Sequence, residues 1–412
     1  MSILAVRSLD KEDKSNIITL GAIAKDAKLK DSSVINATIG MLYDEEGKLF
    51  TFQSVDKVLS QMTSDEKYAY ASTPGSKDFH EALKHWIFRQ YYDEITKNCF
   101  TSVMATPGGT GALSNTIANY LDRNDKVLVP SYMWGNYKQI AKEYDCGYLT
   151  YDLFNAYGKF NLVDLEAKIK TLASKQKNIV VIINDPCHNP TGYSMSEEEW
   201  VELINIINKN STNNPIILLH DMAYIDYDYR GFNFTRKNIT LYNRLNSNAM
   251  AILAFSGSKT LALYGIRIGA QVAISSNVNN INDFDRANKF SSRSKWSNTS
   301  NLGINLVSKI ILDEQMRINF EEELEKARQT LITRANTFLD GCKKCNLETL
   351  PFQCGFFITI PCENAMEVYE KLVEQKVHVI PMGNVLRVTI SAISVKECSL
   401  LPLVIKNAML KE

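Results

Sequence analysis

The sequence has 412 residues, and its 46 lysines and arginines balance 46 aspartates and glutamates. This balance argues against a dedicated nucleic-acid or membrane-surface protein, because neither a basic patch nor an acidic tail dominates. Hydrophobic residues make up 45% of the chain and charged residues 22%. These proportions exclude intrinsic disorder and supply enough apolar surface for a large core.

We expect neither a signal peptide nor a membrane span. Residues 1–30 mix acids and bases, and the longest apolar run, residues 249–255, is far shorter than the roughly 18 residues that cross a bilayer. Eight cysteines scattered over this length do not form a disulfide framework. Cys342 and Cys345 form a close pair, but no second pair or suitably spaced histidine joins them, so their role stays open. We expect a reduced, cytoplasmic protein without a metal site.

Short apolar runs alternate with helical patterns between about residue 100 and residue 275. Strands are predicted at 126–130, 179–184, 216–220 and 251–255, and helices at 111–121, 134–144, 196–209 and 239–245. This alternation predicts an α/β domain with a mostly parallel sheet covered on both faces. One or two long helices follow at 301–340. The last part predicts a smaller α+β domain, with strands at 356–360 and 385–390 and helices at 365–375 and 395–409.

A lysine follows the last predicted strand of the large domain, in a turn of small residues. Residues 256–269 read SGSKTLALYGIRIG, with Lys259 just after the strand and Arg267 farther along. A carbonyl cofactor needs such an amine to form an imine, and the amine must be partly desolvated to react near neutral pH. Hydroxyls at Ser256 and Ser258 with the cation at Arg267 suit a phosphate. In isolation, an incidental surface turn explains the segment equally well.

Three further segments have compositions that suit a ligand site. Residues 106–112 (TPGGTGA) open a helical pattern with glycines, in a turn that presents backbone N–H groups to an anion. Residues 184–192 (NDPCHNPTG) and 220–224 (HDMAY) each end a predicted strand. Ligand sites in open α/β sheets lie beyond the carboxyl ends of the strands, where all four segments fall. The alternatives are a helix cap for Asp221 and core packing for Tyr224.

Together these segments resemble the class I, fold type I, pyridoxal-phosphate-dependent aminotransferases, most closely the aspartate/aromatic branch. The resemblance extends from residues 35–48 to 387–391, and its specific motifs are the lysine segment and residues 188–192 (HNPTG). It implies a large domain with a mostly parallel sheet, of the seven-stranded type, that is covered by helices. It also implies a small α+β domain built from both chain ends. We expect an N-terminal arm and part of the small domain at 1–50, the large cofactor domain at 51–325 and the C-terminal small domain at 326–412.

The resemblance implies three catalytic residues. Lys259 holds pyridoxal 5'-phosphate as an imine and, once released, moves a proton at the substrate α-carbon. Asp221 pairs with the pyridine nitrogen and keeps it protonated. Tyr224 and Asn189 hydrogen-bond the cofactor's phenolic oxygen.

Further cofactor and substrate contacts follow from the same resemblance. Trp134 is expected to stack on the cofactor ring, with Tyr132 as the competing aromatic and core packing as the alternative. Arg387, with Gly40 and Asn189, is expected to bind the substrate, its planar fork taking the α-carboxylate. The phosphate is expected to lie against Gly108, Gly109, Thr110, Ser256, Ser258 and Arg267.

The resemblance also implies a homodimer with shared active sites. Tyr70 is expected to reach the neighbouring subunit's phosphate. Arg293 is expected to bind a dicarboxylate side chain across the interface, although Arg286 and Lys289 lie nearby and a basic stretch is usually a solvated face.

The sequence departs from the family pattern in two places behind the pyridine-binding acid. Tyr137 and Asn184 stand where aspartate-preferring members carry histidines, which alters the hydrogen bonding behind Asp221. Around Gly40, the side chains of Met41, Tyr43 and Leu49 suggest an apolar lining similar to that of aromatic-accepting members.

These features predict an aminotransferase that moves an amino group between aspartate or an aromatic amino acid and 2-oxoglutarate in two half-reactions. One alternative is a lyase that uses the same cofactor for β-elimination or decarboxylation, since the shared residues stabilise the same carbanion. A more remote alternative is a non-catalytic regulator that binds the cofactor. The catalytic set is present, which disfavours that alternative.

Overall fold

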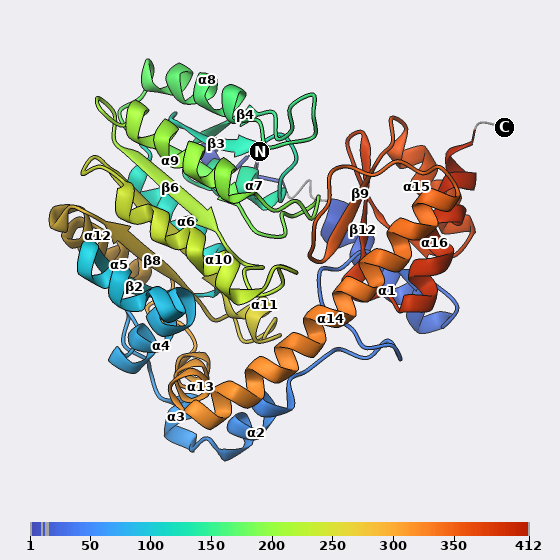
Figure 1. The fold of residues 1–412 in the computed structure, drawn as a ribbon, viewed down its shortest axis with the longest axis horizontal. Coiled ribbons are helices and arrows are strands. Elements are labelled where there is room, and N and C mark those ends of the chain that lie inside the picture. The colour runs from blue at the N-terminus through green and yellow to red at the C-terminus, as the bar shows by residue number, and fades with distance from the viewer. Residues whose placement is uncertain (1, 10, 13–15, 411–412) are drawn as a thin grey trace.

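A central helix joins two bodies of unequal size in the computed structural model, which describes residues 2–9, 11–12 and 16–410 (Figure 1). This helix, α14 (Glu314–Lys344), runs from the base of the larger body along the smaller one. The predicted limit at 325/326 falls inside it, and the predicted arm at 1–50 includes residues 1, 10 and 13–15, which lie outside the described residues. Both domain limits stay predictions. Within the described residues, no helix has the length and apolarity to span a membrane.

The larger body is built on a seven-stranded sheet with the order β2-β8-β7-β6-β5-β3-β4. β8 is antiparallel to β2 and β7, and the other neighbours are parallel, so the predicted mostly parallel sheet is confirmed. The four strands predicted here are present, and the full set is β2 (Phe100–Thr106), β3 (Lys126–Pro130), β4 (Gly147–Tyr151), β5 (Ile179–Asn184), β6 (Ile216–Asp221), β7 (Ala249–Ser256) and β8 (Gly269–Ser275).

Helices cover both faces of this sheet. Alternate residues of one strand enter different cores: Val181 and Ile183 belong to one apolar cluster, Val180 and Ile182 to another. Because side chains alternate across a strand, a strand buried on both faces is apolar throughout. The first cluster includes α4 (Lys77–Phe88), α8 (Leu162–Ala173), α9 (Glu197–Asn210) and α13 (Asn301–Leu312), and the second includes α6 (Gly108–Tyr120), α7 (Asn136–Glu143) and α12 (Val278–Lys295).

One predicted helix of the larger body differs in the structure. In place of the α-helix predicted at 239–245, the chain has a 3₁₀ helix, η3 (Thr240–Arg244), which directly follows α10 (Gly231–Ile239). The tighter turn buries Leu241 and Tyr242 side by side, a requirement of packing that the local pattern does not reveal. The remaining short helices are η1 (Val6–Ser8), α2 (Gln53–Gln61), α3 (Ser64–Tyr68), η2 (Arg89–Tyr91), α5 (Tyr92–Asn98), α11 (Gly257–Thr260) and η4 (Ile390–Ala392).

The core of the smaller body is formed by residues from both ends of the chain. Leu20 and Ala37 pack in one apolar cluster with Phe338, Ile358 and Ile405. A two-stranded parallel sheet pairs β1 with β10, and a three-stranded antiparallel sheet has the order β11-β12-β9. The elements, which include all those predicted after residue 350, are α1 (Asn16–Lys30), β1 (Ile35–Asn36), β9 (Phe357–Pro361), α15 (Ala365–Glu374), β10 (Val377–His378), β11 (Ile380–Met382), β12 (Val385–Thr389) and α16 (Val395–Met409).

Candidate active site

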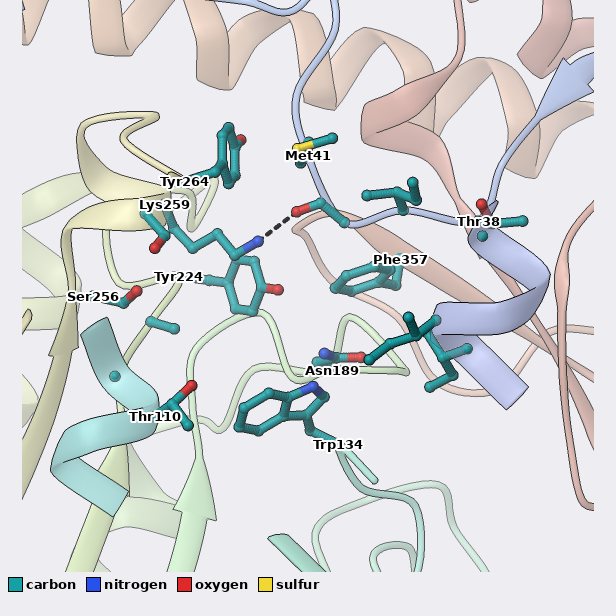
Figure 2. A pocket seen from close by; sticks show the side chains of 18 of the residues that line it. Thr38, Met41, Thr110, Trp134, Asn189, Tyr224, Ser256, Lys259, Tyr264 and Phe357 are labelled. Carbon is teal, nitrogen blue, oxygen red and sulfur yellow. Dashed lines mark hydrogen bonds between the residues drawn. The ribbon is translucent and has the colours of Figure 1, made fainter. Parts of the chain in front are cut away.

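A cavity of about 530 Å³ lies between the strand ends of the large sheet and the smaller body. Its volume is within the usual range of small-molecule sites. Figure 2 shows how side chains from both bodies point into it. The predicted site residues that line it are Gly40, Gly109, Thr110, Trp134, Asn189, Asp221, Tyr224, Ser256, Ser258, Lys259, Arg267 and Arg387.

Sheet topology explains how distant segments meet on one side of the cavity. Asn184, Asp221 and Ser256 are the last residues of the neighbouring strands β5, β6 and β7. Asn184 pairs with Asp221 in register, and β6 and β7 are parallel. Since parallel strands end at the same edge, their following turns converge there.

The amine of Lys259 lies inside this cavity. It sits in α11, the short helix after β7, and its Nζ donates to the carbonyl of Gly40 (Figure 2). The rings of Tyr264 and Tyr224 lie 4.9 and 5.5 Å from Nζ. Burial, and then the positive charges of Arg387 and Arg267, lower the pKa of Lys259 to about 7. A large fraction of the amine is therefore neutral and nucleophilic near neutral pH.

Asp221 forms the buried acid of the site. Its Oδ2 accepts a 2.5 Å hydrogen bond from the hydroxyl of Tyr137, and its Oδ1 accepts one of 3.3 Å from the N–H of Ala223. Burial raises the pKa of Asp221, while these two donors and the charge of Lys259 act in the opposite direction. A carboxylate held this way can pair with a protonated ring nitrogen.

An anion cradle lies at the start of α6. Gly108 opens this helix with φ of +69°, and a Cβ there would stand 2.6 Å from Nη2 of Arg267. Nη1 of Arg267 donates to Oγ of Ser258 over 3.0 Å. A helix N-terminus beside an arginine and hydroxyls fits a phosphate. Gly109, Thr110, Ser256 and Ser258 line the cavity, whereas Gly108 does not.

Arg387 stands on the opposite wall, in β12 of the smaller body. Its Nη2 donates to the carbonyl of Thr38 over 2.7 Å, and its guanidinium lies 4.6 Å from the ring centre of Phe357. Its Nη1 makes a long contact of 3.4 Å with Oδ1 of Asn189, and its Nε is buried with no hydrogen-bond partner among the residues that the structure describes. Burial lowers the pKa of Arg387 to about 10, so the side chain is still a cation at neutral pH. The fork is held in place and keeps capacity for a carboxylate.

Besides Gly108, the predicted residues Tyr70 and Arg293 do not line this chain's own cavity. Tyr70 is 93% exposed. Arg293 is exposed on α12, where its Nη1 bonds Oγ of Ser297. Their assignment to a neighbouring subunit's site stays a prediction.

The predicted apolar and aromatic lining is correct in part. Met41 lines the cavity, but Tyr43 and Leu49 do not, because they pair with each other in an isolated bridge of the 43–49 turn. Trp134 supplies the aromatic wall, whereas the competing Tyr132 packs against Phe154, with ring centres 6.3 Å apart.

Sequence reasoning missed part of the cavity lining. Phe357 and Tyr264 line it, and so does a face of α1. The local signal for α1 is weak: Ile18, Ala22 and Lys25 recur at helical spacing, a pattern shared by ordinary surface helices.

Comparisons with known proteins agree with this geometry. The sequence model of the family described as aminotransferase class I and II matches residues 32–401. The chain is 26% identical over 310 residues to the aspartate aminotransferase of Escherichia coli (strain K12), which covers 74% of this chain and 76% of that protein. It is 25% identical over 303 residues to the aromatic-amino-acid aminotransferase of Paracoccus denitrificans, with 72% and 73% covered.

Solved structures share the whole architecture. An aminotransferase from Anaerococcus prevotii is 30% identical and superposes with a TM-score of 0.95 over 100% of both chains. An aromatic-amino-acid aminotransferase from Burkholderia pseudomallei, 18% identical with a TM-score of 0.80, has the same fold and is covalently bound to pyridoxal phosphate. The chain belongs to the class I and II aminotransferase family and is a pyridoxal-phosphate-dependent transaminase.

Proposed function

We propose that this protein transfers an amino group between aspartate or an aromatic amino acid and 2-oxoglutarate in two half-reactions. The observation that carries the proposal is that the half-buried amine of Lys259 and the buried guanidinium of Arg387 face one cavity from opposite walls. An α-amino acid bound by its carboxylate at Arg387 presents its α-carbon toward Lys259.

In this proposal, Lys259 moves the proton at the substrate α-carbon. The cofactor, when bound, supplies an aldehyde and an electron-accepting ring. With a pKa lowered to about 7, the Nζ of Lys259 can take a proton at the substrate α-carbon and give one back at neutral pH.

The other large-domain residues bind and orient the cofactor. Asp221 takes the pyridine nitrogen, and Tyr224 and Asn189 take the phenolic oxygen. The tryptophan ring of Trp134 faces the cavity beside Asn189 and suits stacking on a planar ring (Figure 2). The phosphate takes the cradle at the N-terminus of α6, where Arg267 and the neighbouring hydroxyls neutralise its charge.

Side-chain specificity rests on two features in this proposal. Apolar side chains such as Ile18, Ile39 and Met41 offer a surface for an aromatic ring. Arg293, on the exposed face of α12, supplies a cation for a distal carboxylate in a neighbouring subunit, where Tyr70 also reaches the phosphate. The proposal therefore includes a homodimer with shared active sites, and we retain the cytoplasm as its location.

A side-by-side rate assay tests the proposal. Purified protein loaded with pyridoxal phosphate is given aspartate, tyrosine or phenylalanine with 2-oxoglutarate, and glutamate formation is measured. We expect glutamate to form from aspartate and from at least one aromatic amino acid. Release of ammonia or carbon dioxide without any need for an added oxo acid would instead indicate a lyase.

A further inference from the structure

The carboxylate of Asp221 and its main chain receive hydrogen bonds from different neighbours. The hydroxyl of Tyr137 donates to Oδ2 over 2.5 Å, and the N–H of Ala223 donates to Oδ1 over 3.3 Å. Asn184 bonds elsewhere: its Nδ2 donates to the main-chain carbonyl of Asp221 over 2.9 Å, and its Oδ1 accepts from the N–H of Asn189 over 2.7 Å. Tyr137 and Asn184, the two departures from the family pattern, therefore bond different parts of Asp221. Asn184 ties two backbone segments together, and Tyr137 binds the carboxylate.

Packing fixes Tyr137 in place. It lies in the first turn of α7, is fully buried, and belongs to the apolar cluster on one face of the large sheet. Its ring meets that of Trp134 edge to face, with the centres 5.6 Å apart and the planes at 90°. One short segment thus carries a ring that faces the cavity and a hydroxyl that lies behind the acid. Because packing already fixes the ring, the hydroxyl of Tyr137 loses little conformational freedom when the cofactor binds.

The phenol at this position is a donor that stays neutral. Burial, and then the negative charge of Asp221, raise the pKa of Tyr137 well above its usual value. The titratable groups that act on this pair are Lys259, Tyr151 and Tyr224, and both tyrosines are themselves held neutral by burial. An imidazole here could gain a proton between about pH 5 and 8 and place a second cation beside the ring nitrogen. A phenol cannot.

We propose that Tyr137 is a positioning residue for the cofactor: it holds Oδ2 of Asp221 with a neutral donor, so that Oδ1, which accepts the longer bond from Ala223, would be available to the pyridine nitrogen. The inference rests on the proposed role of Asp221. A hydrogen bond to the charged form favours the carboxylate over the acid. The hydrogen bond from Tyr137 therefore opposes the burial that raises the pKa of Asp221, and it favours the anionic carboxylate without adding a charge of its own.

The test compares two buried tyrosines. Tyr137→Phe removes the hydroxyl behind Asp221. Tyr151→Phe is the matched control, because Tyr151 is also fully buried and its hydroxyl donates to a main-chain carbonyl, that of Ile182, over 3.3 Å. Tyr137→His restores a donor that can titrate. For each holoenzyme we would measure the cofactor dissociation constant, the pH dependence of the visible absorbance, and kcat and KM, with the thermal midpoint of the cofactor-free protein as the measure of folding.

We expect Tyr137→Phe to weaken cofactor binding and to lower kcat by about tenfold or more with little change in KM, because a hydrogen bond to a charged group is lost. Tyr151→Phe should stay within about twofold of wild type in both, and Tyr137→His should add a new absorbance transition between about pH 5 and 8. Equal losses in the two phenylalanine variants, or a Tyr137→Phe holoenzyme with wild-type affinity and spectrum, would overturn the role of Tyr137. A wild-type protein that binds no pyridoxal phosphate would overturn the proposed function instead.

Discussion

The two walls of the cavity are built in different ways. The wall that includes Lys259 and Asp221 consists of turns after neighbouring strands of one sheet. The wall that includes Gly40 and Arg387 combines an early loop with a late strand, brought together by the smaller body. The first wall follows from local topology, whereas the second depends on a packing event between parts of the chain more than 300 residues apart.

The two walls therefore have different proposed roles: one binds the cofactor and the other binds the substrate. The strand-end wall contains the groups that fit a cofactor. These groups are held by a sheet that is buried under an apolar cluster on each face. The other wall contains Arg387 and the apolar face of α1, which we propose to bind the substrate. Substitutions on the first wall should therefore affect every substrate, and so should those at Arg387, because every substrate has the α-carboxylate that it is proposed to bind. Substitutions at residues that contact only the substrate side chain should be selective.

The largest effect is expected at Lys259. Lys259→Ala removes the group proposed to move the proton, so kcat should fall by roughly 10²–10⁴-fold for all substrates. The variant should still bind pyridoxal phosphate non-covalently, since Asp221 and the phosphate cradle remain. Lys28→Ala is the control, because Lys28 donates to the carbonyl of Val34 outside this cavity. Reduction of the wild-type holoenzyme with borohydride and peptide mapping should find the cofactor on Lys259; its attachment to another lysine would contradict the assignment.

A smaller and equally general loss is expected on the opposite wall. Arg387→Lys keeps the charge but removes the planar fork, so kcat/KM should fall by about 10- to 100-fold for aspartate and aromatic substrates alike. Arg334→Lys is the matched control: Arg334 is also fully buried, but its Nη2 bonds Oε1 of Glu45 over 2.7 Å, away from the cavity. If both variants lost stability and activity together, Arg387 would have a structural role only.

The stability of the cofactor-free protein should depend on pH through Lys259. Its pKa is about 7 in the folded chain, below the 10.5 of an exposed lysine. Between these values the unfolded chain binds more protons, so this residue makes stability rise with pH from about 7 to about 10.5, by at most about 1.4 kcal/mol per pH unit. Urea unfolding at several pH values should show that slope in wild type and a flatter one in Lys259→Met. Parallel curves would mean that the amine is not desolvated.

The same contrast explains what the sequence could predict. The turns after β5, β6 and β7 are predictable because residue type, strand end and parallel pairing all point to one edge. The 3₁₀ turn at η3 and the role of α1 are not, because each depends on the neighbour it packs against rather than on its own pattern. Tyr43 and Leu49 illustrate the limit most directly, since adjacency to Gly40 did not place them in the cavity.

The most selective effect is expected at Arg293, which belongs to neither wall of its own chain. If it reaches a neighbouring subunit's cavity, Arg293→Leu should lower kcat/KM for aspartate and 2-oxoglutarate by about tenfold, the value of an interaction with a charged group. The half-reaction with an aromatic amino acid, followed as loss of the cofactor's visible absorbance in a single turnover, should change by less than about twofold. Arg286→Leu is the control, since Arg286 lies on the same helix and pairs with Asp283 over 2.9 Å. Equal losses on both substrate classes would show that Arg293 supports the fold of α12 or the dimer, and the distal carboxylate would then need a different cation.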